Sequence, residues 1–394
     1  MLKFPKVFHG SDADSLTFGN RIRPTPAQKT HLRGCIKKIR DHLQPRISVA
    51  TKTVLGMEKQ VSPKFRTQGS WAYDTCIDPA SKPPQEMDWD YGVYLPVTVW
   101  EENGPPSKMA RAYFDLVEDL LDDLCKVEGW TLVEGKDTCI RVQVARWGHI
   151  DIPLYAAPEE EFKKITESVA LAKAHTMDTA VLERSEHMEY LEARQQWAEL
   201  DSIVMATRKG VWKHSDPKKV SNWFDDRVEE HGVQLRRVCR YLKAWRDFHW
   251  PAGGPTSVLL MIATSQGFEE KRGRDDLALL DSAQRLSLSL AGEVREPGID
   301  DGEEDFNRLT PPERLIVTQR LRQLAFHLGE AHKGSLNDRH SVLEVLLQQF
   351  GDRIPKDVAR VELDGDVAAI RQTPAVHVVA PVVPSTAAGL GKSK

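Results

Sequence analysis

Thr67-Gln68-Gly69-Ser70, Met87-Asp88-Trp89-Asp90-Tyr91 and His149-Ile150-Asp151-Ile152-Pro153 are the stretches that decide the fold of this chain. A Gly-Ser turn lets backbone amides approach a phosphate, because glycine has no Cβ and a following helix N-terminus carries partial positive charge. Residues two apart share a face of a strand, so Asp88 and Asp90 are expected opposite Met87, Trp89 and Tyr91. Together the three stretches predict a site for a nucleoside triphosphate.

The three aspartates predict a site for two metal ions. An Asp-x-Asp pair alone is more often an exposed acidic pair, but the upstream Gly-Ser turn and the downstream strand aspartate favour catalysis. Oxygen ligands suit Mg²⁺, and two such ions can serve a nucleotidyl transfer. We expect Asp88 and Asp90 to hold the metal ion that binds the triphosphate, and all three aspartates to hold the second metal ion. Asp151 is then closest to the nucleophile, as a candidate general base.

Size and composition predict a cytoplasmic protein with two lobes. The chain has 394 residues, 40% of them apolar and 28% charged, and this exceeds one ordinary hydrophobic core. No apolar run approaches the ~20 residues of a membrane span, and residues 1–5 lack a secretory signal. The net charge of −4 lacks the basic footprint of a protein that binds long nucleic acids. Five scattered cysteines without a Cys-x-x-Cys pair predict reduced packing residues.

Hydrophobic periodicity predicts a mixed α/β first half. A capping box at Thr25 begins a helix that is expected to end at Pro45, and a second helix is expected near Gly69. A strand carries the acidic pair and runs to Pro96. Further segments are a helix over 107–126 and strands over 131–133, 140–145 and 149–154.

Beyond Glu159 the pattern becomes mainly helical, with helices over 220–230 and 233–249 and a loop over 293–310. The fold class is therefore α+β, with a mixed-sheet nucleotidyltransferase lobe, a mainly helical second lobe and a cleft between them. The expected domains are 22–165 for the catalytic lobe, 166–370 for the helical lobe and 371–394 for a disordered tail.

Other polar residues are candidates for binding phosphate. Arg141 projects from a strand, either toward a phosphate or into a surface salt bridge. Lys243 lies on a helix that is followed at once by Gly253-Gly254-Pro255-Thr256-Ser257, so Lys243 and Ser257 are candidates for clamping a triphosphate. Histidines such as His327 and His332 have no zinc-ligand spacing to cysteines, and we expect structural roles for them.

Longer motifs carry a resemblance to a known family. Residues 65–75, 85–90, 149–155, 215–218, 237–247 and 253–255 resemble the polymerase-β-type nucleotidyltransferases, and specifically the bacterial cGAS/DncV-like group. The resemblance covers about residues 60–310. The 17-residue gap between the Gly-Ser turn and the acidic pair is longer than in the wider superfamily but is similar to this group.

The resemblance implies a synthase that joins ATP and GTP into a 3′,3′ cyclic dinucleotide, with cyclic GMP-AMP as the expected product. In this group the product is an alarm signal against phage, read by a product-activated effector protein. The implied nucleotide contacts are Gln68, Gly69, Ser70 and Tyr73 for one nucleotide, Arg141 for phosphate, Ser215 and Asp216 near a base, Lys243 and Ser257 for the other triphosphate, and Asp301 for guanine. An E1/E2-like conjugating enzyme acting on the C-terminal tail is a further implied partner.

Two alternatives share the same residues. A template-independent RNA-tailing nucleotidyltransferase would use the same acids, although it needs a basic or aromatic path for a strand, which the overall acidity disfavours. A catalytically inactive nucleotide-binding scaffold is the other alternative. The presence of all three acids together with the Gly-Ser turn disfavours it.

Overall fold

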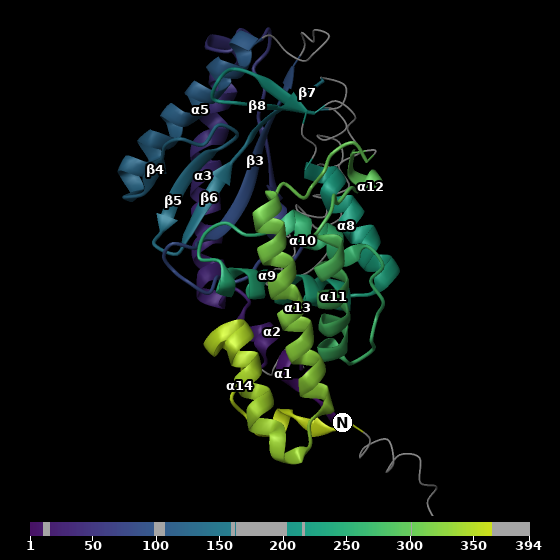
Figure 1. Ribbon diagram of the computed structural model, residues 1–394. Helices are drawn as coiled ribbons and strands as arrows, with labels where there is room; N and C mark the ends of the chain where they lie inside the picture. Colours follow the sequence, from purple (N-terminus) through teal and green to yellow (C-terminus); the bar gives the residue numbers. More distant parts are fainter. Residues whose placement is uncertain are drawn as a thin grey trace, which may run out of the picture.

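The computed structural model describes residues 1–10, 16–97, 107–158, 162, 203–214, 217–300 and 302–364 (Figure 1). The predicted site residues Ser215, Asp216 and Asp301 lie outside the described residues. So do the predicted domain boundary at 165/166 and the predicted tail over 371–394.

The strands are β1 (Leu2–Lys3), β2 (Lys64–Gln68), β3 (Met87–Val97), β4 (Thr131–Val133), β5 (Ile140–Ala145), β6 (Gly148–Ile152), β7 (Leu154–Pro158), β8 (Val204–Ala206), β9 (Trp212–His214) and β10 (Glu362–Leu363). The helices are α1 (Pro5–Phe8), α2 (Phe18–Arg21), α3 (Pro26–Thr53), α4 (Gly69–Ala72), α5 (Ser107–Glu128), α8 (Pro217–His231), α9 (Gln234–His249), α10 (Ser257–Ser265), α11 (Asp275–Ser289), α12 (Pro297–Asp300), α13 (Pro311–Lys333) and α14 (Arg339–Phe350). Short 3₁₀ turns lie at Leu336–Asp338, Gly351–Arg353 and Val358–Arg360.

Strand β3 organises a mixed sheet of eight strands in the described part of the chain. It pairs antiparallel with β2 and parallel with both β6 and β7. Met87 lies opposite Gly148 and Val93 opposite Leu154, so β6 and β7 follow β3 in one register. The sequence predicted a single strand here; Pro153 divides it, because proline cannot donate a ladder hydrogen bond.

Helices α3 and α5 cover one face of this sheet (Figure 1). Their buried side chains form one hydrophobic core with Met87, Trp89, Tyr91, Ile150 and Ile152 from β3 and β6. The alternating residues of these strands therefore lie on the other face, as the period of two predicted. This placement leaves Asp88, Asp90, His149 and Asp151 free of that core.

The helical lobe has its own core, centred on α9. The N-terminal segment belongs to it, since Phe8 and Phe18 pack against Tyr241 of α9 and Phe350 of α14. Strand β1 also pairs with β10, at the two ends of the described chain. The residues before α3 thus pack with the helical lobe rather than with the sheet.

Two elements differ from the sequence prediction. Helix α3 continues past Pro45 to Thr53, because Ile47 extends the buried stripe of Leu43 by one more turn. Burial of Ile47 together with Ala50 and Thr51 offsets the cost of a proline inside a helix, about 3 kcal/mol. The region after Glu159 was predicted to be mainly helical, and the two short strands β8 and β9 in it were not predicted; β8 pairs with β7 and β9 with β8. Among the described residues, no helix is long and apolar enough to cross a membrane.

Candidate active site

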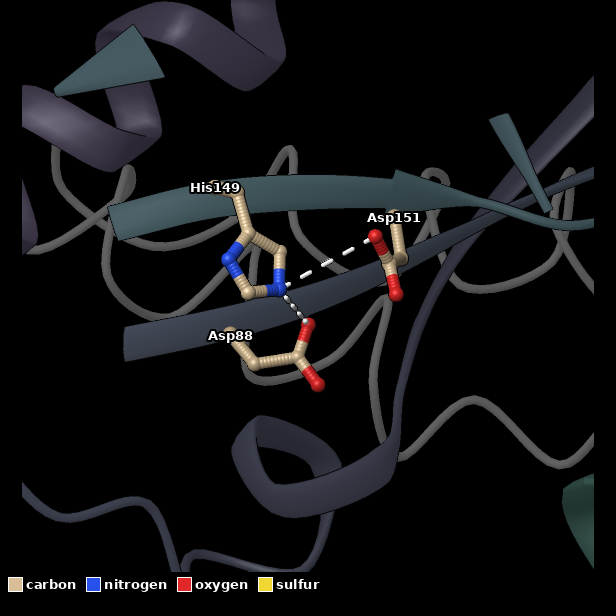
Figure 2. A group of neighbouring side chains, drawn as sticks. All are labelled: Asp88, His149 and Asp151. Carbon is tan, nitrogen blue, oxygen red and sulfur yellow. Dashed lines mark ion pairs between the residues drawn. The ribbon is translucent and has the colours of Figure 1, made fainter. Parts of the chain in front are cut away.

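The register of β3 and β6 brings the acids together. Asp90 lies opposite Asp151, and Asp88 lies opposite His149, on neighbouring parallel strands. One ligand atom each from Asp88, His149 and Asp151 lie within 4.8 Å of one another, and Figure 2 shows the three side chains converging. The three predicted aspartates therefore share one face and one small region of the sheet.

Asp151 is held by Arg141 on the adjacent strand β5. The guanidinium donates from Nε to Oδ1 and from Nη2 to Oδ2, both at 2.7 Å. Burial by itself would raise the pKa of Asp151, but the hydrogen bonds and the charge of Arg141 outweigh burial and lower it. Of the two roles predicted for Arg141, the structure contains a salt bridge, although with a buried catalytic candidate rather than at the surface. Contact with phosphate stays a prediction.

Asp90 lies against the Gly-Ser turn. A Cβ added to Gly69, which has a φ of +60°, would lie 2.0 Å from Asp90 Oδ2. Only glycine permits this approach. Burial, together with the charges of Asp88 and Asp151, raises the pKa of Asp90 to about 8. Clustered carboxylates that repel one another in this way fit a site for divalent cations, because a cation relieves the repulsion.

The sequence assigned no role to His149, yet its ring lies among the acids. Nε2 is 3.2 Å from Asp88 Oδ1 and 3.9 Å from Asp151 Oδ1, and Nδ1 is 2.7 Å from Glu86 Oε2 (Figure 2). Burial by itself would lower the pKa of His149, but the Asp88 carboxylate outweighs burial and raises it. The period-2 pattern contained this signal, since His149 shares the strand face of Asp151.

Aromatic residues hold the Gly-Ser turn at the sheet. Trp71 of α4 stacks on Trp89 of β3 with ring centroids 4.0 Å apart, and its Nε1 donates to the Asp88 carbonyl at 2.9 Å. Gln68 donates to the Tyr94 hydroxyl and accepts from the Tyr155 hydroxyl. The side chain of Gln68 is therefore engaged with two buried tyrosines, and its predicted contact with nucleotide stays a prediction.

A cavity of about 430 Å³ lies on one side of the acids. Its lining includes Ser70, Asp88 and Arg141 from the sheet lobe and Lys243 and Ser257 from the helical lobe. Lys243 Nζ donates to the Thr75 carbonyl at 2.8 Å, and burial lowers the pKa of this lysine.

Arg246, one turn beyond Lys243 on α9, also lines this cavity and was not predicted. Its Nη1 donates to the Pro255 carbonyl at 3.0 Å, close to the start of α10. The three-residue spacing from Lys243 on one helix was the available signal. Arg141, Lys243 and Arg246 thus border this cavity together with the hydroxyls of Ser70 and Ser257.

A second cavity, of about 690 Å³, lies on the other side. Gln68 and Asp151 line it, together with the cations Lys136, Lys219 and Arg308 and the acids Asp300 and Glu304. Gly69, Tyr73 and Asp90 line both cavities, so the two spaces meet at the Gly-Ser turn. Tyr73 packs edge-on against Phe224 of α8, with ring centroids 6.2 Å apart.

Each of the ten predicted site residues that the structure describes lines at least one of these two cavities. They come from β2, α4, β3, β5, β6, α9 and α10, and from the C-terminal end of α4 at Tyr73. Their contacts with nucleotide stay predictions.

Comparison with known proteins gives matches in both lobes. Residues 63–155 match the family described as cyclic GMP-AMP synthase DncV-like, nucleotidyltransferase domain. Residues 232–362 match the family described as cyclic GMP-AMP synthase, C-terminal domain.

Relatives that match about three quarters of this chain agree. A cyclic GMP-AMP synthase of Escherichia coli is 40% identical over 308 residues, which are 74% of this chain and 68% of the relative. One of Vibrio cholerae is 33% identical over 306 residues, which are 75% of this chain and 68% of the relative.

A solved structure gives the same result for the fold. Vibrio cholerae DncV cyclic AMP-GMP synthase, in complex with the linear intermediate pppA(3′,5′)pG, is similar with a TM-score of 0.72 and 26% identity. The similarity covers 92% of this chain and 99% of that one. The chain therefore belongs to the DncV-like family of nucleotidyltransferases.

Proposed function

We propose that the protein joins two nucleoside triphosphates into a cyclic dinucleotide. The observation that carries the proposal is the pair of cavities that meet at Gly69, Tyr73 and Asp90. Asp88 lines only the first cavity and Asp151 only the second, while Asp90 lines both. Two substrates bound on either side would thus have the acids between them, where one nucleotide attacks the other.

In this proposal the first cavity takes the donor triphosphate. Lys243 and Arg246 supply positive charge, and Ser70 and Ser257 supply hydroxyl donors for phosphate oxygens. The second cavity takes the acceptor nucleotide, with its 3′ hydroxyl directed toward Asp151. Arg141 keeps Asp151 ionised and oriented by its two hydrogen bonds.

Asp88, Asp90 and Asp151 would hold two Mg²⁺ ions, as their oxygen donors and mutual repulsion fit. Bound there, the ions supply charge neutralisation at the α-phosphate and the pyrophosphate, and they favour the ionised hydroxyl. The acceptor 3′ oxygen forms a bond to the donor α-phosphorus, the bond to pyrophosphate breaks, and the hydroxyl proton leaves to a base. Asp151 is the candidate for that base.

Cyclisation requires a second transfer in the same site. The linear product of the first step must turn, so that its remaining triphosphate enters the first cavity and its free 3′ hydroxyl faces Asp151. A related synthase from Vibrio cholerae binds such a linear intermediate, pppA(3′,5′)pG. Two separate cavities that meet at one set of acids suit this reuse better than one continuous strand channel.

We propose ATP and GTP as the substrates and 3′,3′ cyclic GMP-AMP as the product. The names of the relatives support this choice. The anti-phage role, the product-activated effector and the E1/E2-like partner follow from the resemblance to the family. The nucleotide contacts proposed for Ser215, Asp216 and Asp301 rest on the same resemblance.

The test is to incubate the purified protein with ATP, GTP and Mg²⁺ and to analyse phosphatase-resistant products by mass spectrometry. The expected product is a cyclic dinucleotide, absent with the Asp88→Ala/Asp90→Ala double variant. A growing linear tail on a single-stranded RNA primer would favour the RNA-tailing alternative. Full biological activity of the double variant would favour the scaffold.

A further inference from the structure

A third cavity lies apart from the two at the acids. It has a volume of about 210 Å³ and lies between the N-terminal segment and α9. Its described lining includes four arginines and one acid, namely Arg23, Arg236, Arg237, Arg240 and Asp74. No described residue lines both this cavity and one of the other two. The third cavity is therefore a separate space.

Acids behind the cavity wall pair with two of these arginines. Arg237 donates from Nε and Nη2 to the buried Asp275, at 2.7 and 2.8 Å. Arg236 Nη2 donates to Asp225 at 3.0 Å. The Nε of Arg236, in contrast, is buried and makes no hydrogen bond within the described part of the chain. A buried N–H without an acceptor is costly, so this group favours the arrival of a further acceptor.

The other two arginines share a single carboxylate. Arg240 Nη2 donates to Asp74 Oδ2 at 2.6 Å, and Arg23 Nη2 lies 3.5 Å from the same oxygen. The side chain of Asp74 is 64% exposed, whereas that of Arg240 is 7% exposed. Burial, together with the charges of Arg23 and Arg236, lowers the pKa of Arg240, although Asp74 opposes this shift. Four guanidinium groups are thus paired with three described carboxylates, which leaves an excess of one positive charge.

We propose that this cavity binds a small phosphoryl anion, inorganic phosphate or pyrophosphate, which Arg23, Arg236 and Arg240 hold in competition with the Asp74 carboxylate. Guanidinium groups form charge-assisted hydrogen bonds with phosphate oxygens. The volume is below the roughly 300–1,000 Å³ of pockets for larger organic ligands, so the occupant is a small anion rather than a nucleotide. The site goes beyond the proposed function, which places no ligand here.

Asp74 connects this cavity to the Gly-Ser turn. The next residue, Thr75, donates its N–H to the Ser70 carbonyl at 2.8 Å, and Arg240 Nε donates to the Asp74 carbonyl at 2.8 Å. Asp74 has a φ of +50°, a conformation that a residue other than glycine keeps only where its surroundings fix it. An anion that draws Arg240 from the Asp74 carboxylate loosens this segment, so it should weaken triphosphate binding at the turn.

The first experiment titrates phosphate, and separately pyrophosphate, into the full chain by calorimetry, with EDTA, without nucleotide and at about 0.15 M salt. The wild type should bind at least one of these anions. Arg23→Gln and Arg236→Gln each remove a guanidinium group and should weaken that binding about tenfold or more. Asp74→Asn removes the competing charge and tolerates the positive φ, so it should tighten binding several-fold.

Two control variants separate this cavity from other sites. Arg272→Gln changes an arginine that is 90% exposed and lies outside the cavity lining, so it should leave anion binding unchanged. Lys243→Met alters the first cavity at the acids and should leave the arginine-dependent binding in place. If Arg236→Gln does not fold, Arg23→Gln, at a side chain 35% exposed, still tests the proposal.

Three results would overturn the site. The first is a wild type that binds neither anion. The second is equal anion binding by the wild type, Arg23→Gln and Arg236→Gln. The third is loss of all anion binding in Lys243→Met, which would place the anion at the acids instead.

The second experiment tests the connection to the turn. Binding of a non-hydrolysable triphosphate is measured in the wild type and in Arg23→Gln, without phosphate and with enough phosphate to fill the site in the wild type only. Direct competition by phosphate near the acids affects both proteins alike, so the wild type should lose several-fold more triphosphate affinity. Equal losses would overturn the connection through Asp74. Because the first experiment uses no nucleotide, its outcome is independent of whether the protein makes a cyclic dinucleotide.

Discussion

Gly69 and Asp90 are in such close contact that a single methyl group between them is excluded. A Cβ on Gly69 would lie 2.0 Å from Asp90 Oδ2, and the φ of Gly69 is +60°. Gly69→Ala must therefore displace the Asp90 carboxylate. Because misplacement by about 1 Å costs on the order of 100-fold in rate, we expect at least that loss of product formation.

Gly129→Ala is the matched control for this substitution. Gly129 has a φ of +70° and no atom within 4 Å of an added Cβ, so it shares the backbone strain without the clash. Gly129→Ala should lose about 1 kcal/mol of unfolding free energy from backbone strain, and Gly69→Ala at least as much, measured by chemical denaturation. Only Gly69→Ala should lose activity; equal activities in the two variants would show that the Gly69–Asp90 contact is dispensable.

Asp90 should make the metal-free protein less stable at alkaline pH. Its folded pKa is about 8, raised from 3.8. The folded state therefore holds this proton more tightly, and the resulting stability is present at acid pH and is lost as the pH rises through about 8. In EDTA, Asp90→Asn should melt at a higher temperature than the wild type at pH 8.5, with the difference shrinking toward pH 5.

Magnesium should reverse that difference. At pH 8.5 the ion binds the ionised carboxylates, so it should raise the melting temperature of the wild type more than that of Asp90→Asn. Thermal unfolding without Mg²⁺ and with Mg²⁺ at about ten times its Kd measures the effect. Parallel pH profiles for the two proteins would contradict the raised pKa.

Arg141→Ala should destabilise the protein through Asp151. It leaves a carboxylate that is only 9% exposed without its partner, and breaking such a pair costs about 3 kcal/mol. Arg141 lowers the folded pKa of Asp151, so this stabilisation is present above pH 3.8 and is lost as the pH falls through the lowered value. The difference between Arg141→Ala and the wild type, measured by urea unfolding, should therefore shrink in acid.

A double variant tests the cause. Arg141→Ala/Asp151→Asn removes the unpaired charge and should recover part of the stability that Arg141→Ala loses at pH 7. If the double variant is as unstable as the sum of the two single variants, the guanidinium contributes through packing instead.

Lys243→Met should separate stability from nucleotide binding. Methionine fills the space of the buried lysine without a buried charge, so the unfolding free energy should fall little or rise. Loss of a charge-assisted hydrogen bond to phosphate should weaken triphosphate binding about tenfold or more, measured by calorimetry with a non-hydrolysable analogue. Binding of the corresponding nucleoside should not change, and an equal loss for both ligands would argue against a phosphate contact.

Much of the fold could be predicted because the relevant signals are local. The capping box at Thr25, the amphipathic stripe of α5 and the alternation in β3 and β5 depend on neighbours within a few residues, and the structure confirms them. Strands β8 and β9 were missed because three residues carry little periodicity. Their formation depends on the free edge of β7, a partner some fifty residues earlier.

The candidate site divides in the same way. The two-residue period determined which residues of β3 and β6 share a face, so the sequence alone predicted the common side of Asp88, Asp90 and Asp151. The same period would have included His149, but nothing local distinguishes a histidine among the site acids from a packing histidine. Its environment depends on Glu86 and Asp88, which reach it only through the pairing of β3 with β6.

By itself, the sequence determined the fold class, the family and the face on which the acids lie, because periodicity and motif spacing are properties of consecutive residues. Only the tertiary structure decided that Arg141 pairs with Asp151, that Gly69 contacts Asp90 and that two cavities meet at Tyr73. These relationships join separate strands and separate lobes. They depend on register and on packing between elements, which no local pattern of residues specifies.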